Sequence, residues 1–203
     1  MTDANAILST MTVSDRRLRH TLGVAEAAKE LAKAHFPELD LKTVELAALM
    51  HDYTKEYPIE RHLELCALFG LEVSEDDIAN YKLLHAKTGA LLAKDSFGLP
   101  DDACSAVYWH TTGKPEMTPF ETVIYLADYI EEFREDSSCV ALREYYRKCM
   151  QKEKDHAIAL LKTLVRSFDT TLKLLISEEK IIDENTIKAR NYYLKQLIES
   201  KKG

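Results

Sequence analysis

Six polar side chains with the chemistry of metal ligands interrupt the apolar faces of consecutive helical segments. They are His20, His51, Asp52, His85, His110 and Asp128. His20, for example, falls on the same helical face as Val24 and Leu31. A carboxylate or imidazolium that is buried without a partner is strongly destabilising, so residues of this kind should meet one another or a ligand in the interior.

Taken one at a time, these residues fit a plainer interpretation. A single histidine on an apolar face is more often a hydrogen-bonded core residue than a ligand, and Asp128 alone fits half of a buried ion pair. The combination favours a metal site, because successive helical segments each supply a His or Asp and the His51-Asp52 pair supplies two at one helix end. Facing helices of a bundle commonly assemble such sites, and nitrogen and carboxylate donors without thiolate favour iron, manganese, cobalt or zinc.

Helices are the elements that must position these side chains, since apolar residues recur at helical spacing and no strand-like alternation occurs. The clearest start is Thr118-Pro119-Phe120-Glu121, which combines an N-cap, a proline in the first turn and a capping-box glutamate. One helix is expected from Ser74 towards Gly98, and one or two long helices over 138–180. The expected helices begin at or near Ser14, Asp40, Pro58, Ser74, Ala103, Thr118, Ser138 and Asp183.

The composition indicates the same fold class. The chain has 6 glycines and 5 prolines in 203 residues. Their share is about 5%, against ~12% in an average protein. Because β and α/β folds use glycine at their turns, the shortage predicts an all-α protein, and the length corresponds to one domain.

The sequence carries no sign of export or membrane insertion. No stretch approaches ~18 consecutive apolar residues, and the segment Met1–Met11 lacks a basic region and a cleavage site. The cysteines form no CxxC pair, which disfavours a zinc ribbon or a redox dithiol. We therefore expect a cytoplasmic, reduced protein that does not bind a membrane.

The charge balance limits the partners. With 27 basic and 34 acidic residues the net charge is −7 and the pI is about 5.5. A broad basic surface for polymeric nucleic acid or anionic lipid is therefore not expected. A small anionic ligand in a locally positive pocket remains compatible with this balance.

The order His20, His51-Asp52, Asp128 resembles the HD-domain metal-dependent phosphohydrolases, which are named for their histidine–aspartate doublet. The surrounding segments resemble the YqeK group of bacterial HD proteins, from about Arg16 to Leu194. They read RRLRHTLGVAEAAKELA, AALMHDYTKE, LLHAKTGALL, WHTTGKPEMTPFETVIYLADYIEEFRE and TIKARNYYL.

This resemblance implies a fold and an activity. The fold would be a compact, all-α HD-domain helical bundle with a central metal site, forming a single domain over residues 1–203. Its C-terminal helices, about 138–203, would pack on a catalytic core of about 14–135. The activity would be symmetrical hydrolysis of diadenosine tetraphosphate to two ADP, by attack of metal-bound water on a phosphoanhydride.

The resemblance also assigns metal ligands. They would be His20, His51, Asp52 and Asp128, holding one firmly bound divalent ion, with iron favoured and manganese, cobalt or zinc as alternatives. His85 and His110 have two interpretations: they complete a second metal site with Asp52 bridging, or they bind phosphate.

Cationic side chains near these ligands complete the implied site. Lys55, three residues beyond the doublet, would neutralise charge on the transferring phosphoryl group together with His85 and His110. Arg17 and Arg134 match family arginines and suit bidentate phosphate binding, although a surface ion pair explains them equally well. The catalytic set would be Asp52, Lys55, His85 and His110, and the substrate-binding set Arg17, Lys55, His85, His110 and Arg134.

Other functions stay open at this point. The chain could be a different HD-type nucleotide phosphohydrolase, such as a nucleoside monophosphatase, or a non-catalytic nucleotide-binding module on a degenerate HD scaffold. Because such modules usually lose a ligand and all six candidates are present here, an enzyme is favoured. A purely structural adaptor leaves the six polar residues unexplained, and a homodimer is compatible with the sequence.

Overall fold

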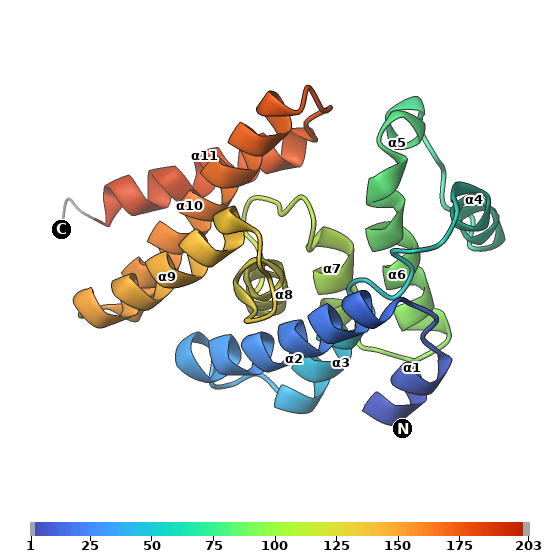
Figure 1. Ribbon diagram of the computed structural model, residues 1–203, viewed down its shortest axis with the longest axis horizontal. Coiled ribbons are helices and arrows are strands. Elements are labelled where there is room, and N and C mark those ends of the chain that lie inside the picture. The colour runs from blue at the N-terminus through green and yellow to red at the C-terminus, as the bar shows by residue number, and fades with distance from the viewer. Residues whose placement is uncertain (1–2, 201–203) are drawn as a thin grey trace.

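The computed structural model of the protein describes residues 3–200, and within them every regular element is helical (Figure 1). This confirms the predicted all-α class. The elements are α1 (Ala4–Thr10), α2 (Asp15–His35), α3 (Leu41–Met50), α4 (Ile59–Leu68), α5 (Glu75–Ala79), the 3₁₀ helix η1 (Tyr81–Leu83), α6 (Leu84–Asp95), α7 (Asp101–Trp109), α8 (Pro119–Ile130), α9 (Ser137–Lys152), α10 (His156–Ser177) and α11 (Glu184–Glu199).

Side-chain caps explain where several helices begin. The carboxylate of Asp40 accepts a hydrogen bond from the backbone N–H of Thr43 at the start of α3. Thr118 and Glu121 form the expected capping box at the start of α8. Each cap satisfies a backbone N–H that has no partner within its own helix. The predicted starts at these residues are therefore confirmed.

The expected single helix from Ser74 to Gly98 is wrong, since the segment forms α5, η1 and α6 in succession. Asn80 interrupts it with φ −117° and ψ 44°, outside the helical region. An asparagine side chain competes with the helical backbone for hydrogen bonds, and periodicity alone does not detect that break. The structure also adds α1, whose N-cap is Asp3. Over 138–180 two helices form, α9 and α10.

The central helix is α2, which packs against α3 on one side and α8 on another. Helix α7 lies against α3, α6 and α8, so that these five helices share one core (Figure 1). Helices α10 and α11 pair with each other, and α10 also contacts α2 and α8. The ring of Phe168 in α10 stacks on Tyr125 of α8 and on Tyr193 of α11, with centroid distances of 4.8 and 6.0 Å.

The loop between α7 and α8 is held by α11. The Thr186 hydroxyl donates to the carbonyl of Thr112 at 3.1 Å, and the N–H of Met117 donates to the Tyr193 hydroxyl at 2.9 Å. Gly113 has φ +62°, and a Cβ there would meet the Phe168 ring at 2.7 Å. The loop that follows His110 is thus fixed in place by residues much later in the chain.

Among residues 3–200, none of the helices has the length and apolar character needed to cross a membrane.

Candidate metal centre

The structure brings all six predicted ligand residues together in the interior. Two groups of donors, each with all its ligand atoms within 4.8 Å of one another, share Asp52. They are His20, His51 and Asp52 on one side, and Asp52, His85 and His110 on the other. Asp128 adjoins the first group, with its Oδ1 3.0 Å from His20 Nε2 and 3.8 Å from His51 Nε2.

The six side chains come from five helices or their ends. His20 lies in α2, and His51 and Asp52 lie where α3 ends. His85 is in the first turn of α6 and His110 directly follows α7, while Asp128 is in the last turn of α8. The packing of these five helices around one core is therefore what assembles the cluster (Figure 1).

Backbone carbonyls set the tautomers of three of these histidines. The Nδ1 atom of His51 is 2.6 Å from the carbonyl of Ala48, and that of His110 is 2.7 Å from the carbonyl of Val107. His85 Nδ1 lies 2.5 Å from the Lys82 carbonyl. Because a carbonyl only accepts, Nδ1 carries the proton in each ring, and a neutral ring then has its lone pair on Nε2.

These Nε2 lone pairs face one another across the cluster. His85 Nε2 is 3.2 Å from His110 Nε2, and His51 Nε2 is 3.3 Å from His20 Nε2. Burial lowers the pKa of His51, and burial together with Lys55 lowers the pKa of His85 to about 3. The lowered pKa values favour the neutral forms of His51 and His85, whose Nε2 lone pairs are then available to a cation between the nitrogens.

The two carboxylates of the cluster also favour a bound cation. Asp52 Oδ1 is buried and finds no hydrogen-bond partner among the residues that the structure describes, although His85 Nε2 lies 3.1 Å away. Burial raises the pKa of Asp52, but His51 and Lys55 beside it hold that pKa well below its usual range. For Asp128 burial again raises the pKa, and Arg134 and His20 hold it well below the usual range. Two ionised carboxylates among imidazole lone pairs fit a divalent metal ion.

The three predicted cationic residues line the same cluster. Arg17 pairs with Oδ2 of Asp52, and Arg134 donates to Oδ1 of Asp128 at 2.6 Å and to its carbonyl at 2.8 Å. Lys55 Nζ lies 3.0 Å from His85 Nε2 and 3.6 Å from Asp52 Oδ1. Their side chains are 25–32% exposed, so these charges lie between the buried ligands and solvent.

Sequence reasoning missed Glu131, whose carboxylate contacts Nδ1 of His20, on the side of the ring opposite the cluster. Glu131 is 1% exposed, and its Oε1 lies 3.1 Å from Nδ1 of His20 while its Oε2 accepts the N–H of Phe133 at 2.6 Å. Burial lowers the pKa of His20, but the hydrogen bonds to Asp128 and Glu131 raise it above its ordinary value. A carboxylate on the outer nitrogen orients a metal-binding imidazole and increases its basicity.

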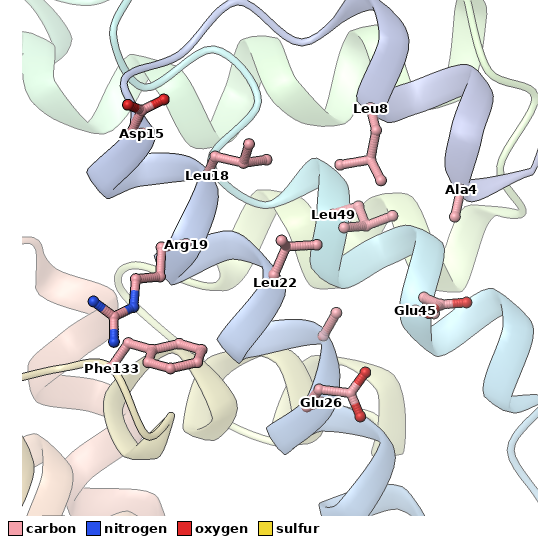
Figure 2. Close-up of a pocket in the computed structure, with 11 residues that line it drawn as sticks. Ala4, Leu8, Asp15, Leu18, Arg19, Leu22, Glu26, Glu45, Leu49 and Phe133 are labelled. Atoms are coloured by element: carbon pink, nitrogen blue, oxygen red, sulfur yellow. The ribbon is translucent and has the colours of Figure 1, made fainter.

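The signal that could have revealed Glu131 is Gly23, one turn beyond His20. A Cβ at Gly23 would lie 2.2 Å from Glu131 Oε2 and 2.8 Å from the Phe133 ring. The guanidinium of Arg19 stands over that ring, 4.5 Å from its centroid (Figure 2). Glycine is thus required for this segment to approach α2 closely.

Sequence reasoning also left out His62, which is 3% exposed in α4. Its Nδ1 lies 2.8 Å from the Thr88 hydroxyl, which lies 3.0 Å from the hydroxyl of Thr54. The Thr54 hydroxyl donates to the carbonyl of His85 at 2.9 Å. This buried network fixes the first turn of α6, where His85 lies, and its only sequence signal was the apolar face that His62 shares with Cys66.

Fold and site together define a helical protein with a buried histidine–carboxylate centre built on the H…HD…D order. A family model described as "HD domain" matches residues 17–132, which is more than half of the chain. The chain belongs to the HD-domain family. The HD-type fold expected from the motifs is thereby confirmed.

Similar proteins of known sequence agree with this assignment. A relative from Halalkalibacterium halodurans, named "Bis(5'-nucleosyl)-tetraphosphatase, symmetrical", is 34% identical over 90% of this chain and 91% of its own length. A relative of the same name from Bacillus subtilis is 32% identical over 89% of this chain and 90% of its own length. The resemblance to the YqeK group is confirmed by these matches.

A solved structure has the same fold. The crystal structure of a predicted HD superfamily hydrolase involved in NAD metabolism, from Clostridium acetobutylicum, superposes with a TM-score of 0.83. It is 36% identical in sequence, and the superposition covers 97% of this chain and 99% of that one.

Proposed function

We propose that this protein is a metal-dependent phosphohydrolase that cleaves diadenosine tetraphosphate symmetrically into two ADP. The observation that carries the proposal is Asp52, an ionised, buried carboxylate that is shared by two groups of ligands and bordered by the cations Arg17 and Lys55. The names of the relatives from H. halodurans and B. subtilis, which match nearly the whole chain, support the substrate and the symmetry of cleavage.

We propose His20, His51, Asp52 and Asp128 as the ligands of one divalent ion, and Asp52, His85 and His110 as those of a second. Iron is the proposed metal, and manganese, cobalt and zinc suit the same donors. When bound, such an ion supplies Lewis acidity, which acidifies water and offsets charge on phosphoryl oxygens.

The side chains in and around this cluster would orient the attacking water and bind the polyphosphate. Asp52 is placed both to hold an ion and to orient the attacking water, because within residues 3–200 its buried Oδ1 has no hydrogen-bond partner. Lys55, Arg17 and Arg134 carry positive charge at the edge of the centre and bind the polyphosphate, which stabilises the charge that develops on its oxygens.

The bond changes balance with one water per substrate. The water oxygen attacks the second phosphorus from one adenosine, and the bond from that phosphorus to the central bridging oxygen breaks. The bridging oxygen leaves with the other half, so that both products are ADP. Attack on the third phosphorus with cleavage at the same central bridge would give the same two ADP, whereas cleavage of either outer phosphoanhydride would give AMP and ATP.

Replacement of Asp52 by Ala tests the proposal. We expect the variant to lose both bound metal and turnover, measured by metal analysis and by chromatography of the products from diadenosine tetraphosphate. Asp169→Ala is a matched control, because Asp169 is a carboxylate that pairs with Arg190 and lies outside the cluster. An active, metal-loaded Asp52→Ala protein would contradict the scheme, and so would a wild type that releases free adenosine or AMP with ATP.

We also propose that residues 1–203 form one domain, with α9, α10 and α11 packed on the ligand-bearing helices. The contacts of α10 with α2 and α8 support this organisation. Limited proteolysis should leave the chain intact from α2 through α11. Light scattering after gel filtration tests whether the protein forms the homodimer with which its sequence is compatible.

A further inference from the structure

One buried charge has no part in the proposed chemistry, the guanidinium of Arg143 in α9. Arg143 is 9% exposed. Within residues 3–200 its ion-pair partner is Glu132, whose Oε2 lies 3.6 Å from Arg143 Nε. The Glu132 side chain is 62% exposed and also pairs with Arg147. Because an exposed, shared carboxylate contributes little and a buried guanidinium needs hydrogen bonds, the burial of Arg143 depends on its other contacts.

Those contacts are two backbone carbonyls at the ends of one turn, residues 131–134. Arg143 Nη1 donates to the carbonyl of Glu131, and Nη2 donates to the carbonyl of Arg134 at 3.4 Å. The Arg134 N–H donates to the Glu131 carbonyl across the turn at 3.4 Å. A guanidinium has its donors in a planar, fixed fork, so one side chain holds both carbonyls at a set separation. Arg143 thus ties α9 to the connection that follows α8 (Figure 1).

Each end of the 131–134 turn also contacts a candidate metal ligand. Glu131 Oε1 lies 3.1 Å from Nδ1 of His20. Arg134 donates to Oδ1 of Asp128 at 2.6 Å and to the Asp128 carbonyl at 2.8 Å. A displacement of the turn would therefore reach two of the four proposed ligands of the first ion.

The histidines of the second group are oriented by other parts of the chain. Nδ1 of His85 contacts the carbonyl of Lys82 in η1, and Nδ1 of His110 contacts the carbonyl of Val107 in α7. Neither contact involves α9 or the 131–134 turn. The two groups of ligands should therefore respond differently to a change at Arg143.

We propose that Arg143 is a positioning residue of the metal centre, which orients His20 and Asp128 through the two ends of the 131–134 turn. The inference rests on the proposed function, because it takes both residues as ligands of the metal ion. It differs from a role in stability alone, in which the positive charge of Arg143 would only stabilise the carboxyl end of α8. Any cation near that helix end would serve the second role, whereas the first needs a donor fork that reaches both carbonyls.

Two substitutions of Arg143 test the inference. Arg143→Lys keeps the positive charge and loses the fork, and Arg143→Met loses both. Competition with a chelator for Mn²⁺ measures the metal affinity of the full-length protein. We expect Arg143→Met to bind the metal about 10-fold more weakly, the lower end of the range for partners of ligand residues, and Arg143→Lys to restore only part of that affinity. If Arg143→Met does not fold, Arg143→Lys decides alone, because it keeps the charge at the helix end.

Nitrogen-15 NMR of the imidazole rings in the Zn²⁺-loaded protein separates positioning from stability. We expect Arg143→Lys to shift the ring nitrogens of His20 and to leave those of His85 and His110 at their wild-type positions. A loss of stability alone would not single out one ring. The double variant Glu131→Gln/Arg143→Met should lose less affinity than the product of the two single losses, because both changes act on the same contact with His20.

Two further variants in α9 are matched controls. Arg147→Met removes the other cation that pairs with Glu132, one turn beyond Arg143. Leu142→Ala truncates a core side chain that is 2% exposed and directly precedes Arg143. Urea unfolding should show that Leu142→Ala is destabilised. Both controls should bind Mn²⁺ as the wild type does.

Wild-type Mn²⁺ affinity in Arg143→Met, or full affinity in Arg143→Lys, would overturn the inference, since the fork would then be unnecessary. An affinity loss in Leu142→Ala equal to that in Arg143→Met, or shifts in all three rings, would overturn it as well. The products of the wild type test the proposed function separately. If that protein forms no ADP from diadenosine tetraphosphate, the proposed function is wrong, while the metal affinities and ring spectra still decide the role of Arg143.

Discussion

Glu131→Gln isolates the contribution of a single buried carboxylate to the metal centre. The carboxylate accepts two hydrogen bonds, from His20 Nδ1 on one oxygen and from the N–H of Phe133 on the other. Glutamine keeps the shape but has only one acceptor oxygen. If that oxygen stays with Phe133, whose bond is 2.6 Å, the amide N–H₂ faces His20 Nδ1. The His20 proton then moves to Nε2, which removes the lone pair that faces the centre.

The expected size of the effect follows from this loss. Replacing a partner on the outer nitrogen of a ligand histidine costs ~10- to 100-fold in metal affinity. That corresponds to about 1.4–2.8 kcal/mol. If the amide turns the other way, the Phe133 N–H is left unsatisfied, at a cost of ~1–3 kcal/mol in the free energy of unfolding. Either orientation leaves a measurable defect.

Competition with a chelator for Mn²⁺ gives the affinity, and urea unfolding of the metal-free protein gives the stability. Glu121→Gln is the matched control, because Glu121 lies at the other end of α8, is also 1% exposed and accepts from the N–H of Thr118 at 2.8 Å. We expect this control to lower stability and leave metal affinity unchanged. A Glu131→Gln protein that matches the wild type in both metal affinity and stability, or an equal loss of metal affinity in both variants, would refute the reasoning.

Three further predictions concern single residues. Gly23→Ala should lower the free energy of unfolding by about 1–3 kcal/mol, because the new Cβ would lie 2.2 Å from Glu131 Oε2. This loss should outweigh the better helix propensity of alanine. Urea unfolding measures the change, and a variant more stable than the wild type would contradict the close approach. Burial and the neighbouring His156 lower the pKa of His35 to about 4. The pKa of His35 in the unfolded chain is higher, so the unfolded chain binds a proton first as the pH falls. The contribution of His35 to the free energy of unfolding should therefore be complete above pH ~6.5 and decrease by about 1 kcal/mol as the pH drops towards 4. Thermal melts should show a flatter pH dependence for His35→Gln. Lys55→Met should reduce kcat by ~100-fold with metal content intact, the size expected for one charge-stabilising donor; a loss of metal that parallels the loss of kcat would instead make Lys55 a structural residue.

Local sequence signals predicted most of the helices and the residues that lie together in the buried cluster. A cap acts within one turn, so the Thr118–Glu121 box could be recognised without knowledge of the rest of the fold. Likewise, His20 and His85 stood out because each interrupts an apolar face. These signals do not depend on which helices become neighbours.

Features that depend on distant contacts were not predictable in this way. In the sequence, Glu131 is one of several acidic residues near a helix end. Its contact with His20 depends on the close approach of its segment to Gly23 of α2, which only the folded structure shows. A hollow of about 510 Å³ between η1 and the α10–α11 connection combines segments that are about a hundred residues apart, from Tyr81 to Ile181. Periodicity reports that a face is buried and does not report what covers it.

The anchoring of the loop after His110 by α11 also has a consequence for how the protein is made. Every candidate ligand, from His20 to Asp128, leaves the ribosome before Thr186 and Tyr193, whose side chains hold that loop. At a synthesis rate of ~5–20 residues per second, the nascent chain carries all its ligands for several seconds before the loop can be fixed. The cluster of candidate ligands is thus completed late in translation, and if it holds the proposed metal, a ribosome-bound chain that stops before α11 should retain that metal poorly.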